Sequence, residues 1–179
     1  MNNLAHIKLL ALDFDGVMTD NSVYIFEDGT EAVQCSRADG EGIKLLKAAG
    51  IEVIVITAES RSVLAEKRCA KLGVQCLVSQ NKLASLKEFI GYRIAFGQVA
   101  YIGNDLSDLE CLQAVGYPAI PRNLEPSLAK TLGPLFCPYD DHTYCAHDAP
   151  IAYMIQRQGG RGAVREVCDM ILEAKLVAP

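Results

Sequence analysis

The sequence predicts an α/β fold built on one doubly wound parallel sheet. Short apolar runs typical of strands alternate with longer segments typical of helices along most of the chain, and this order implies right-handed crossovers between parallel strands. The strand runs are continuously apolar, which indicates strands that are covered on both faces. Polar side chains follow several of these runs, at the sheet edge where such folds bind ligands.

Each element follows from its local pattern. Residues 7–12 form the first apolar run, and residues 51–56 form a second run that is rich in β-branched side chains. Gly50 and Gly73 follow two of the predicted helices as stop signals. The remaining predicted strands are residues 74–78, 99–102 and 117–120, and the predicted helices are residues 41–48, 60–72, 82–89, 106–115 and 163–175.

A β-hairpin is predicted between the first strand and the first helix. Residues 23–26 and 31–35 have strand character, and the segment between them carries Asp28-Gly29, a pair typical of hairpin turns. The insert is too small for an independent lid domain, so we expect a single domain over residues 1–179. Its parts are the hairpin at about 20–36, an irregular excursion at about 134–158, and a C-terminal tail and helix at 159–179.

Composition narrows the class of protein. Of the 179 residues, 50% are hydrophobic and 22% are charged, with a net charge of −5, which excludes a disordered chain. No dense Lys/Arg run is present, so neither nucleic acid nor an anionic membrane is expected as a partner. No apolar run reaches the roughly 18–20 residues that span a bilayer, and the first residues lack the pattern of a signal peptide. We expect a cytoplasmic protein.

Cysteine and glycine clusters are assigned to packing and loops. The seven cysteines form no Cys-x-x-Cys pair, and we expect reduced, buried thiols. His142, Cys145, His147 and Asp148 match no standard zinc spacing, which favours a polar loop. Residues 159–162 lack the G-x-G-x-x-G pattern of a dinucleotide-binding loop.

Two carboxylates follow the first predicted strand. Asp13 and Asp15 are two residues apart on an extended chain, so both can point toward one space while Phe14 packs on the other side. Carboxylates this close repel each other, and a cation is needed to keep both ionised. Oxygen ligands without a nearby His or Cys suit Mg²⁺ rather than zinc. One carboxylate can attack phosphorus as a nucleophile while the other handles the proton of the leaving group.

Polar residues from other strands are expected at the same edge. Thr57 ends the second strand, Lys82 opens the helix after the third, and Asn104, Asp105 and Asp108 follow the fourth. Thr57 and Lys82 are suited to bind phosphate oxygens, and the lysine would neutralise charge in the transition state. A single carboxylate at a strand end usually caps a turn. Several chain-distant segments that meet at one edge instead favour a site for phosphoryl transfer.

These motifs resemble those of the haloacid-dehalogenase (HAD) superfamily of phosphatases. Residues 13–20, DFDGVMTD, resemble its first motif, and residues 55–57, 81–83 and 103–108 resemble the second, third and fourth. The stretch GGRGAVRE at 159–166 is similar to the C-terminal signature of the 3-deoxy-manno-octulosonate 8-phosphate (KDO 8-phosphate) phosphatase family. That family also includes nonulosonate 9-phosphate phosphatases and the C-terminal domains of animal acylneuraminate cytidylyltransferases. The resemblance spans about residues 7–175, apart from the excursion.

The resemblance implies a Rossmann-like HAD fold without a cap, a Mg²⁺ cofactor and a homotetramer whose subunits share active sites. By motif, Asp13 is the nucleophile, and Asp15 is the general acid/base that also offers its backbone carbonyl to the metal. Thr57 and Lys82 bind phosphate, and Arg161 lines the pocket of the neighbouring subunit. The implied reaction removes phosphate from a phosphorylated 2-keto-3-deoxy sugar acid through an aspartyl-phosphate.

One departure from the family pattern concerns the metal. Asn104 stands where the family usually has an aspartate. We therefore expect a ligand set of Asp13, Asp15 and the Asn104 amide, with Asp105 or Asp108 compensating for the missing charge. An amide oxygen can bind Mg²⁺ without contributing negative charge.

Three further departures concern the substrate and the tail. Arg37 is displaced by one position from the family's Arg-Asp-Gly, and Ala58-Glu59 stand where octulosonate enzymes have Gly-Arg. We expect Arg37, Ala58 and Glu59 to contact substrate. The segment 134–158 is longer than the family's usual link. Two alternatives stay open, namely a nonulosonate (KDN or sialic acid) 9-phosphate phosphatase, and an inactive oligomerisation domain like that of the cytidylyltransferases.

Overall fold

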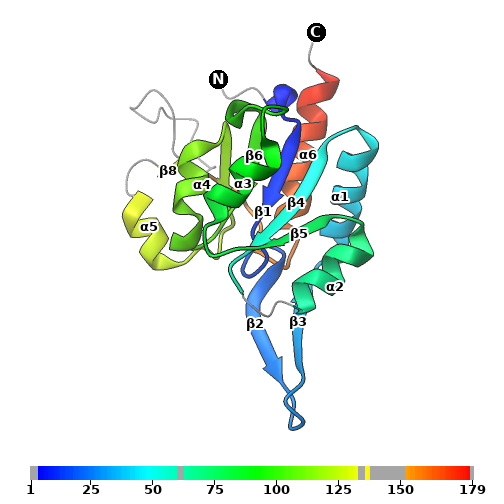
Figure 1. Cartoon of the computed structure of the whole chain (residues 1–179), viewed down its shortest axis with the longest axis vertical. Helices are drawn as coiled ribbons and strands as arrows, with labels where there is room; N and C mark the ends of the chain where they lie inside the picture. Colours follow the sequence, from blue (N-terminus) through cyan, green and yellow to red (C-terminus); the bar gives the residue numbers. More distant parts are fainter. Residues whose placement is uncertain (1–3, 60–62, 133–135, 138–151, 178–179) are drawn as a thin grey trace.

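A computed structural model of the chain describes residues 4–59, 63–132, 136–137 and 152–177. Within these ranges a seven-stranded sheet has the order β5-β4-β1-β6-β7-β9-β8. Every neighbouring pair in it is parallel. Helices cover both faces of the sheet (Figure 1). The predicted doubly wound α/β fold is therefore confirmed.

The elements follow one another in the predicted alternation. The strands are β1 (Leu9–Leu12), β2 (Thr19–Ile25), β3 (Glu31–Cys35), β4 (Glu52–Thr57), β5 (Gln75–Val78), β6 (Val99–Ile102), β7 (Tyr117–Ile120), β8 (Phe136–Cys137) and β9 (Ala152–Met154). The helices are α1 (Arg37–Ala48), α2 (Val63–Leu72), α3 (Lys82–Ile90), α4 (Leu109–Ala114), α5 (Pro126–Leu132) and α6 (Ala163–Leu176), with short 3-10 turns η1 (Leu4–His6), η2 (Phe96–Gln98) and η3 (Leu106–Asp108).

Strand β1 divides the core into two layers. Leu10 and Leu12 belong to a cluster with buried side chains of α1, α2 and α6. Leu9 and Ala11 belong to a second cluster with side chains of α3, α4 and α5. All four residues are fully buried. Because successive strand side chains point to opposite faces, the continuous apolar run supplies both layers at once.

The predicted hairpin is formed by β2 and β3 and projects away from the sheet (Figure 1). Its turn has Gly29 at φ +81°, and the Asp28 carboxylate accepts hydrogen bonds from the backbone N–H and hydroxyl of Thr30. Strand β2 begins at Thr19, four residues earlier than predicted. The side chain of Ile25 is 74% exposed, and those of Tyr24 and Phe26 are more than half exposed.

Some boundaries differ from the prediction. Helix α1 begins at Arg37, not at residue 41, because the Ser36 hydroxyl accepts a hydrogen bond from the Ala38 N–H and caps it. Helix α5 was not predicted at all. The excursion is not irregular throughout, because β9 lies within it and pairs with β7. The cluster of His142, Cys145, His147 and Asp148 lies outside the described residues.

The helices that the structure describes include none that is long and apolar enough to cross a membrane. The ring of Tyr153, in β9, stacks on that of Tyr117 in β7, with ring centroids 4.8 Å apart. This stacking helps to hold β9 against β7, its neighbour in the sheet.

Candidate active site

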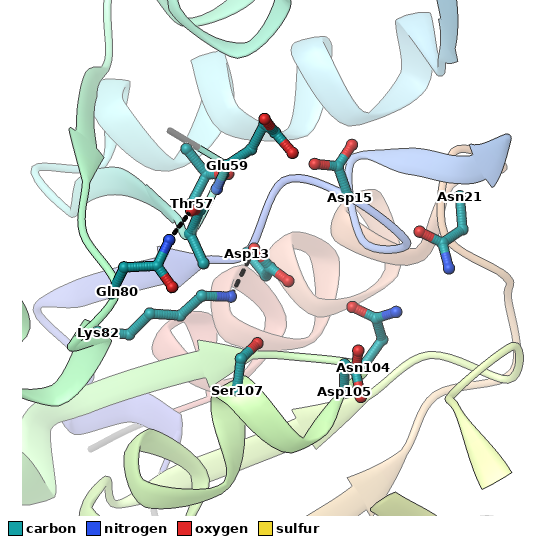
Figure 2. A pocket seen from close by; sticks show the side chains of 11 residues that line it. Asp13, Asp15, Asn21, Thr57, Glu59, Gln80, Lys82, Asn104, Asp105 and Ser107 are labelled. Atoms are coloured by element: carbon teal, nitrogen blue, oxygen red, sulfur yellow. Dashed lines mark hydrogen bonds and ion pairs between the residues drawn. The ribbon is translucent and has the colours of Figure 1, made fainter. Parts of the chain in front are cut away.

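The site lies where β4, β1 and β6 end side by side. Asp13 follows β1, Thr57 ends β4 and Asn104 follows β6, so one edge of the sheet brings three chain-distant segments together. Lys82 reaches the same point from the first turn of α3 (Figure 2). The cavity between them has a volume of about 240 Å³. Its lining consists of Asp13, Asp15, Asn21, Thr57, Ala58, Glu59, Gln80, Lys82, Asn104, Asp105 and Ser107.

Lys82 sits between two carboxylates at the floor of the cavity. Its Nζ lies 2.8 Å from Oδ1 of Asp13 and 2.8 Å from Oδ1 of Asp108, and the lysine is 2% exposed. Burial lowers the pKa of Lys82, but the two carboxylates outweigh it and raise that pKa above its usual value. The ammonium is therefore held charged, and its position is fixed from two sides.

The environment of Asp13 favours a reactive carboxylate. Its Oδ1 accepts hydrogen bonds from the Phe14 N–H at 2.7 Å and from Lys82. Burial and the charge of Asp108 raise the pKa of Asp13 to about 7, against the opposing effect of Lys82. Among the described residues these contacts all fall on Oδ1, which leaves Oδ2 to act on a ligand in the cavity.

Asp15 has a different environment, two residues further along. It is half-buried at the cavity mouth, and burial together with the charge of Glu59 raises its pKa. Lys82 and the Thr19 hydroxyl act in the opposite direction. A raised pKa suits a carboxyl group that must donate a proton and later take one back.

The residues present fit a divalent cation. Asn104 is 2% exposed, and its Oδ1 is a buried acceptor without a hydrogen-bond partner in the described part of the chain. Figure 2 shows this amide beside Asp13 and below Asp15, on the same side of the cavity. No cluster of three His, Cys, Asp or Glu side chains that could hold a metal occurs among the residues placed by the structure. The candidate set is the Asp13 carboxylate, the backbone carbonyl of Asp15 and the Asn104 amide oxygen, all oxygen donors that suit Mg²⁺.

The prediction of Asp108 as a metal ligand is wrong. The residue is fully buried and does not line the cavity. Its Oδ1 accepts hydrogen bonds from Lys82 and the Tyr101 hydroxyl, and its Oδ2 accepts them from the backbone N–H groups of Asn104 and Asp105. All of its acceptor capacity is used inside the protein, so it orients Lys82 and the turn after β6 instead.

Asp105 and Thr57 both line the cavity but differ in burial. Asp105 is exposed, and its carboxylate accepts a hydrogen bond from the Leu106 N–H at 2.6 Å, so it caps the following turn. Thr57 is buried, and its hydroxyl accepts a hydrogen bond from the Glu59 N–H at 3.2 Å. The Ala58 carbonyl accepts one from the Gln80 side chain. This short loop therefore has a fixed shape against the cavity.

Two predicted substrate-binding arginines lie outside the cavity lining. Arg37 is exposed at the first position of α1. Arg161 is 59% exposed, and its guanidinium lies 3.8 Å from the Asp20 carboxylate of the same chain. The backbone beside Arg161 is fixed, because the N–H of the neighbouring Gly160 donates a hydrogen bond to the Val17 carbonyl at 3.1 Å.

Sequence reasoning also missed residues of the site. Asn21, Gln80 and Ser107 also line the cavity. Asn21 lies in the predicted hairpin, Gln80 between a predicted strand and a predicted helix, and Ser107 in the helix predicted at 106–115. Tyr101 is fully buried in β6 and donates its hydroxyl to Asp108 at 2.6 Å. In the sequence it looks like one more apolar strand residue. The one signal in the sequence that Tyr101 belongs to the site is its polar hydroxyl, which faces the fourth motif in the structure.

Comparison with known proteins identifies the family. No family model matches the sequence. The 3-deoxy-D-manno-octulosonate 8-phosphate phosphatase of Salmonella typhi is 36% identical over 178 residues, covering 98% of this chain and 84% of that protein. The crystal structure of the phosphatase of the same name from Yersinia pestis has a TM-score of 0.80 at 34% identity, over 97% of this chain and 84% of that one.

A third relative carries ligands. The Moraxella catarrhalis enzyme of the same name, solved in complex with magnesium, phosphate and KDO, has a TM-score of 0.78. It is 31% identical, over 97% of this chain and 90% of that one. With identities above 30% over nearly the full length, the chain belongs to the KDO 8-phosphate phosphatase family of HAD phosphatases.

Proposed function

We propose that the protein is a Mg²⁺-dependent phosphomonoesterase that releases phosphate from a phosphorylated 2-keto-3-deoxy sugar acid of the KDO 8-phosphate type. The observation that carries this proposal is the buried ion pair between Lys82 and Asp13 at the floor of an open cavity. The lysine holds one oxygen of Asp13 and presents its positive charge where a phosphate would sit. This is the arrangement that a carboxylate nucleophile requires.

In the first half-reaction, Oδ2 of Asp13 attacks phosphorus. The bond between phosphorus and the sugar oxygen breaks, and Asp15 donates its proton to that oxygen. The raised pKa of Asp15 supports this role, because burial and the charge of Glu59 favour the protonated form that can donate. The Thr57 hydroxyl and the Lys82 ammonium are placed to bind the non-bridging phosphate oxygens.

In the second half-reaction, the aspartyl-phosphate is hydrolysed. Asp15, now ionised, takes a proton from a water molecule whose oxygen attacks phosphorus. The bond to Asp13 breaks, and inorganic phosphate leaves. The half-buried position of Asp15 at the cavity mouth supports its access to water.

We assign the cation to Asp13, the carbonyl of Asp15 and Oδ1 of Asn104. A bound Mg²⁺ would supply positive charge that keeps Asp13 ionised and stabilises the transferring phosphoryl group. The unpartnered, buried Oδ1 of Asn104 supports this assignment, since such an acceptor requires a partner. The magnesium in the Moraxella catarrhalis relative supports the choice of metal.

The test is phosphate release from KDO 8-phosphate with Mg²⁺ and with a chelator. We expect Mg²⁺-dependent turnover that Asp13→Asn reduces by about 10³-fold or more, since the nucleophile is lost. The matched control is Asp169→Asn, on the outer face of α6 and half exposed, which should leave turnover unchanged. Near-normal hydrolysis by Asp13→Asn would overturn the mechanism.

The substrate is tested separately from the chemistry. Ala58 and Glu59 lie at the cavity wall, where they would contact the sugar acid. The names of the relatives favour the eight-carbon substrate. We therefore expect kcat/KM for KDO 8-phosphate to exceed that for a nine-carbon sugar acid 9-phosphate by at least about tenfold. The reverse preference would leave a phosphatase with a different substrate.

We further propose that the protein acts as a homotetramer with sites shared between subunits. Tyr24, Ile25 and Phe26 on the projecting hairpin are more than half exposed, and apolar patches of this kind mark interaction surfaces. The exposed guanidinium of Arg161 would then serve a neighbouring site. Native mass measurement tests the assembly. When Arg161→Ala and Asp13→Asn subunits are mixed, part of the activity should return, because some sites then combine an intact Asp13 with an intact Arg161. Mixed oligomers that form without regaining activity would refute the shared site.

We also propose a cytoplasmic location, a reducing compartment. The structure supports it by leaving Cys35, Cys69, Cys76, Cys111 and Cys168 as free thiols.

A further inference from the structure

The loop that follows Asp13 packs against the glycine-rich stretch at residues 159–162, which precedes α6. The Gly160 N–H donates to the Val17 carbonyl at 3.1 Å. A Cβ at Gly159 would lie 1.9 Å from the Gly16 carbonyl oxygen, and one at Gly160 would lie 2.5 Å from the Asp20 nitrogen. Two backbones therefore touch directly, at positions where a side chain would force them apart.

Asn123 joins the same two backbones. It lies in the loop after β7, and its Oδ1 accepts a hydrogen bond from the Gly159 N–H at 2.7 Å. Its Nδ2 donates to the Gly16 carbonyl at 3.4 Å, a longer contact. One amide side chain thus satisfies a donor on the late stretch and an acceptor on the early loop. We refer to Asn123 with Gly159 and Gly160 as the Asn123 clamp.

Gly16 connects this clamp to the proposed metal ligands. It directly follows Asp15, and its φ of +77° lies in the left-handed region. The amide of Asn104 packs against its α-carbon so closely that a Cβ there would lie 2.1 Å from Nδ2. A displacement of Gly16 therefore moves two members of the ligand set together, namely Asp15 and Asn104.

We propose that Asn123 is a positioning residue that sets the affinity of the site for a divalent cation. This rests on the proposed function, in which Asp15 and Asn104 help to hold Mg²⁺. Asn123 does not line the cavity, and its side chain forms hydrogen bonds with the backbones of Gly16 and Gly159. It acts through the carbonyl of Gly16, which it holds at the distance that leaves room for the Asn104 amide. Groups that orient metal ligands in this way typically change metal affinity by about 10–100-fold when removed.

The test is direct cation binding, with Mn²⁺ as the probe and no substrate. Free Mn²⁺ is counted by electron paramagnetic resonance during titration of the full chain. Asn123→Ala removes both hydrogen bonds, and we expect its Kd for Mn²⁺ to rise by about tenfold. Asn123→Ser, whose side chain is too short to join both backbones, should show a similar rise with less disturbance of packing. The matched control is Arg122→Ala, the exposed neighbour in the same loop, which should bind Mn²⁺ as the wild type does.

A purely structural role predicts a different result. The thermal midpoint of the metal-free variants would fall, while the Kd of the folded protein for Mn²⁺ stayed within twofold of wild type. That result overturns the proposal, as would loss of folded protein in both Asn123 variants or an equal loss of affinity in Arg122→Ala. The readout does not need turnover. Wild-type protein that binds Mn²⁺ but hydrolyses no sugar acid phosphate would refute the proposed function, and the Kd ratio would still decide the role of Asn123.

Discussion

Replacing Asp39 with asparagine should stabilise the protein at neutral and alkaline pH. Asp39 lies in the first turn of α1 and is 1% exposed. Its Oδ1 accepts a hydrogen bond from the Arg165 N–H at 2.9 Å, in the first turn of α6. The N-cap of α6 is Gly162, which has no side chain, so Asp39 caps this helix from a distant part of the chain. Its Oδ2 is buried without a hydrogen-bond partner in the described residues.

The magnitude follows from the pKa of Asp39. Burial raises it from 3.8 to about 6, and outweighs the opposing effects of the Arg165 and Gly162 backbone and of the nearby guanidinium of Arg68. The native state therefore binds this proton more tightly than the unfolded state. The stability that the protonated Asp39 carboxyl contributes is present in full below pH 3.8 and is lost as pH rises through about 6. At about 1.4 kcal/mol per pH unit, the ionised carboxylate costs about 3 kcal/mol at pH 8.

Asparagine has the same shape, keeps the acceptor for the Arg165 N–H and carries no charge. Urea unfolding at pH 4 and at pH 8 should show Asp39→Asn more stable than wild type by up to about 3 kcal/mol at pH 8, with most of the gain gone at pH 4. The matched control is Glu41→Gln on the same helix, whose exposed pair with Lys44 should contribute under about 0.5 kcal/mol. An Asp39→Asn protein less stable than wild type at pH 8 would show that capping by the charge outweighs its burial.

The other predictions concern the site. Asn104→Asp adds a negative charge to the ligand set, so the Mg²⁺ concentration for half-maximal activity should fall by about tenfold in a metal titration; an unchanged requirement would remove Asn104 from that set. Lys82→Met leaves two carboxylates buried without their counter-ion, so urea unfolding at pH 8 should show a loss of about 3–5 kcal/mol, together with loss of turnover. Tyr101→Phe removes one donor from Asp108 and should cost about 1–3 kcal/mol. A stability equal to wild type would mean that a water replaces that hydroxyl.

Most of the sheet could be predicted because its signals are local. The run at β6 was predicted with its observed bounds, Val99–Ile102, and the same holds for β7 at Tyr117–Ile120. Strand β9 is a three-residue element, too short for any periodicity to reveal. Its place depends on pairing with β7 and on the stacking of Tyr153 with Tyr117, which are tertiary contacts. The start of α1 differs from the apolar pattern because the Ser36 hydroxyl caps the helix before that pattern begins.

The site residues also divide into those that the local sequence predicts and those whose place depends on tertiary contacts. Asp13, Thr57 and Asn104 were expected together because the carboxyl ends of parallel strands share an edge, and the structure brings them there. The sequence does not reveal whether a carboxylate in a turn faces the cavity or the interior. Asp105 and Asp108 are equally plausible ligands by position, yet one is exposed and the other is fully buried with four hydrogen bonds.

The charges around the cavity support the proposed roles of a metal ion and of a neighbouring subunit. Among the described residues of the lining, four carboxylates face one ammonium, that of Lys82. A phosphorylated sugar acid brings a phosphate and a carboxylate of its own into this negative site. A divalent cation offsets the charge where phosphate binds, but it leaves the carboxylate of the substrate without a positive partner. In the proposed tetramer, Arg161, which is exposed and outside the lining of its own cavity, would supply that partner to another subunit.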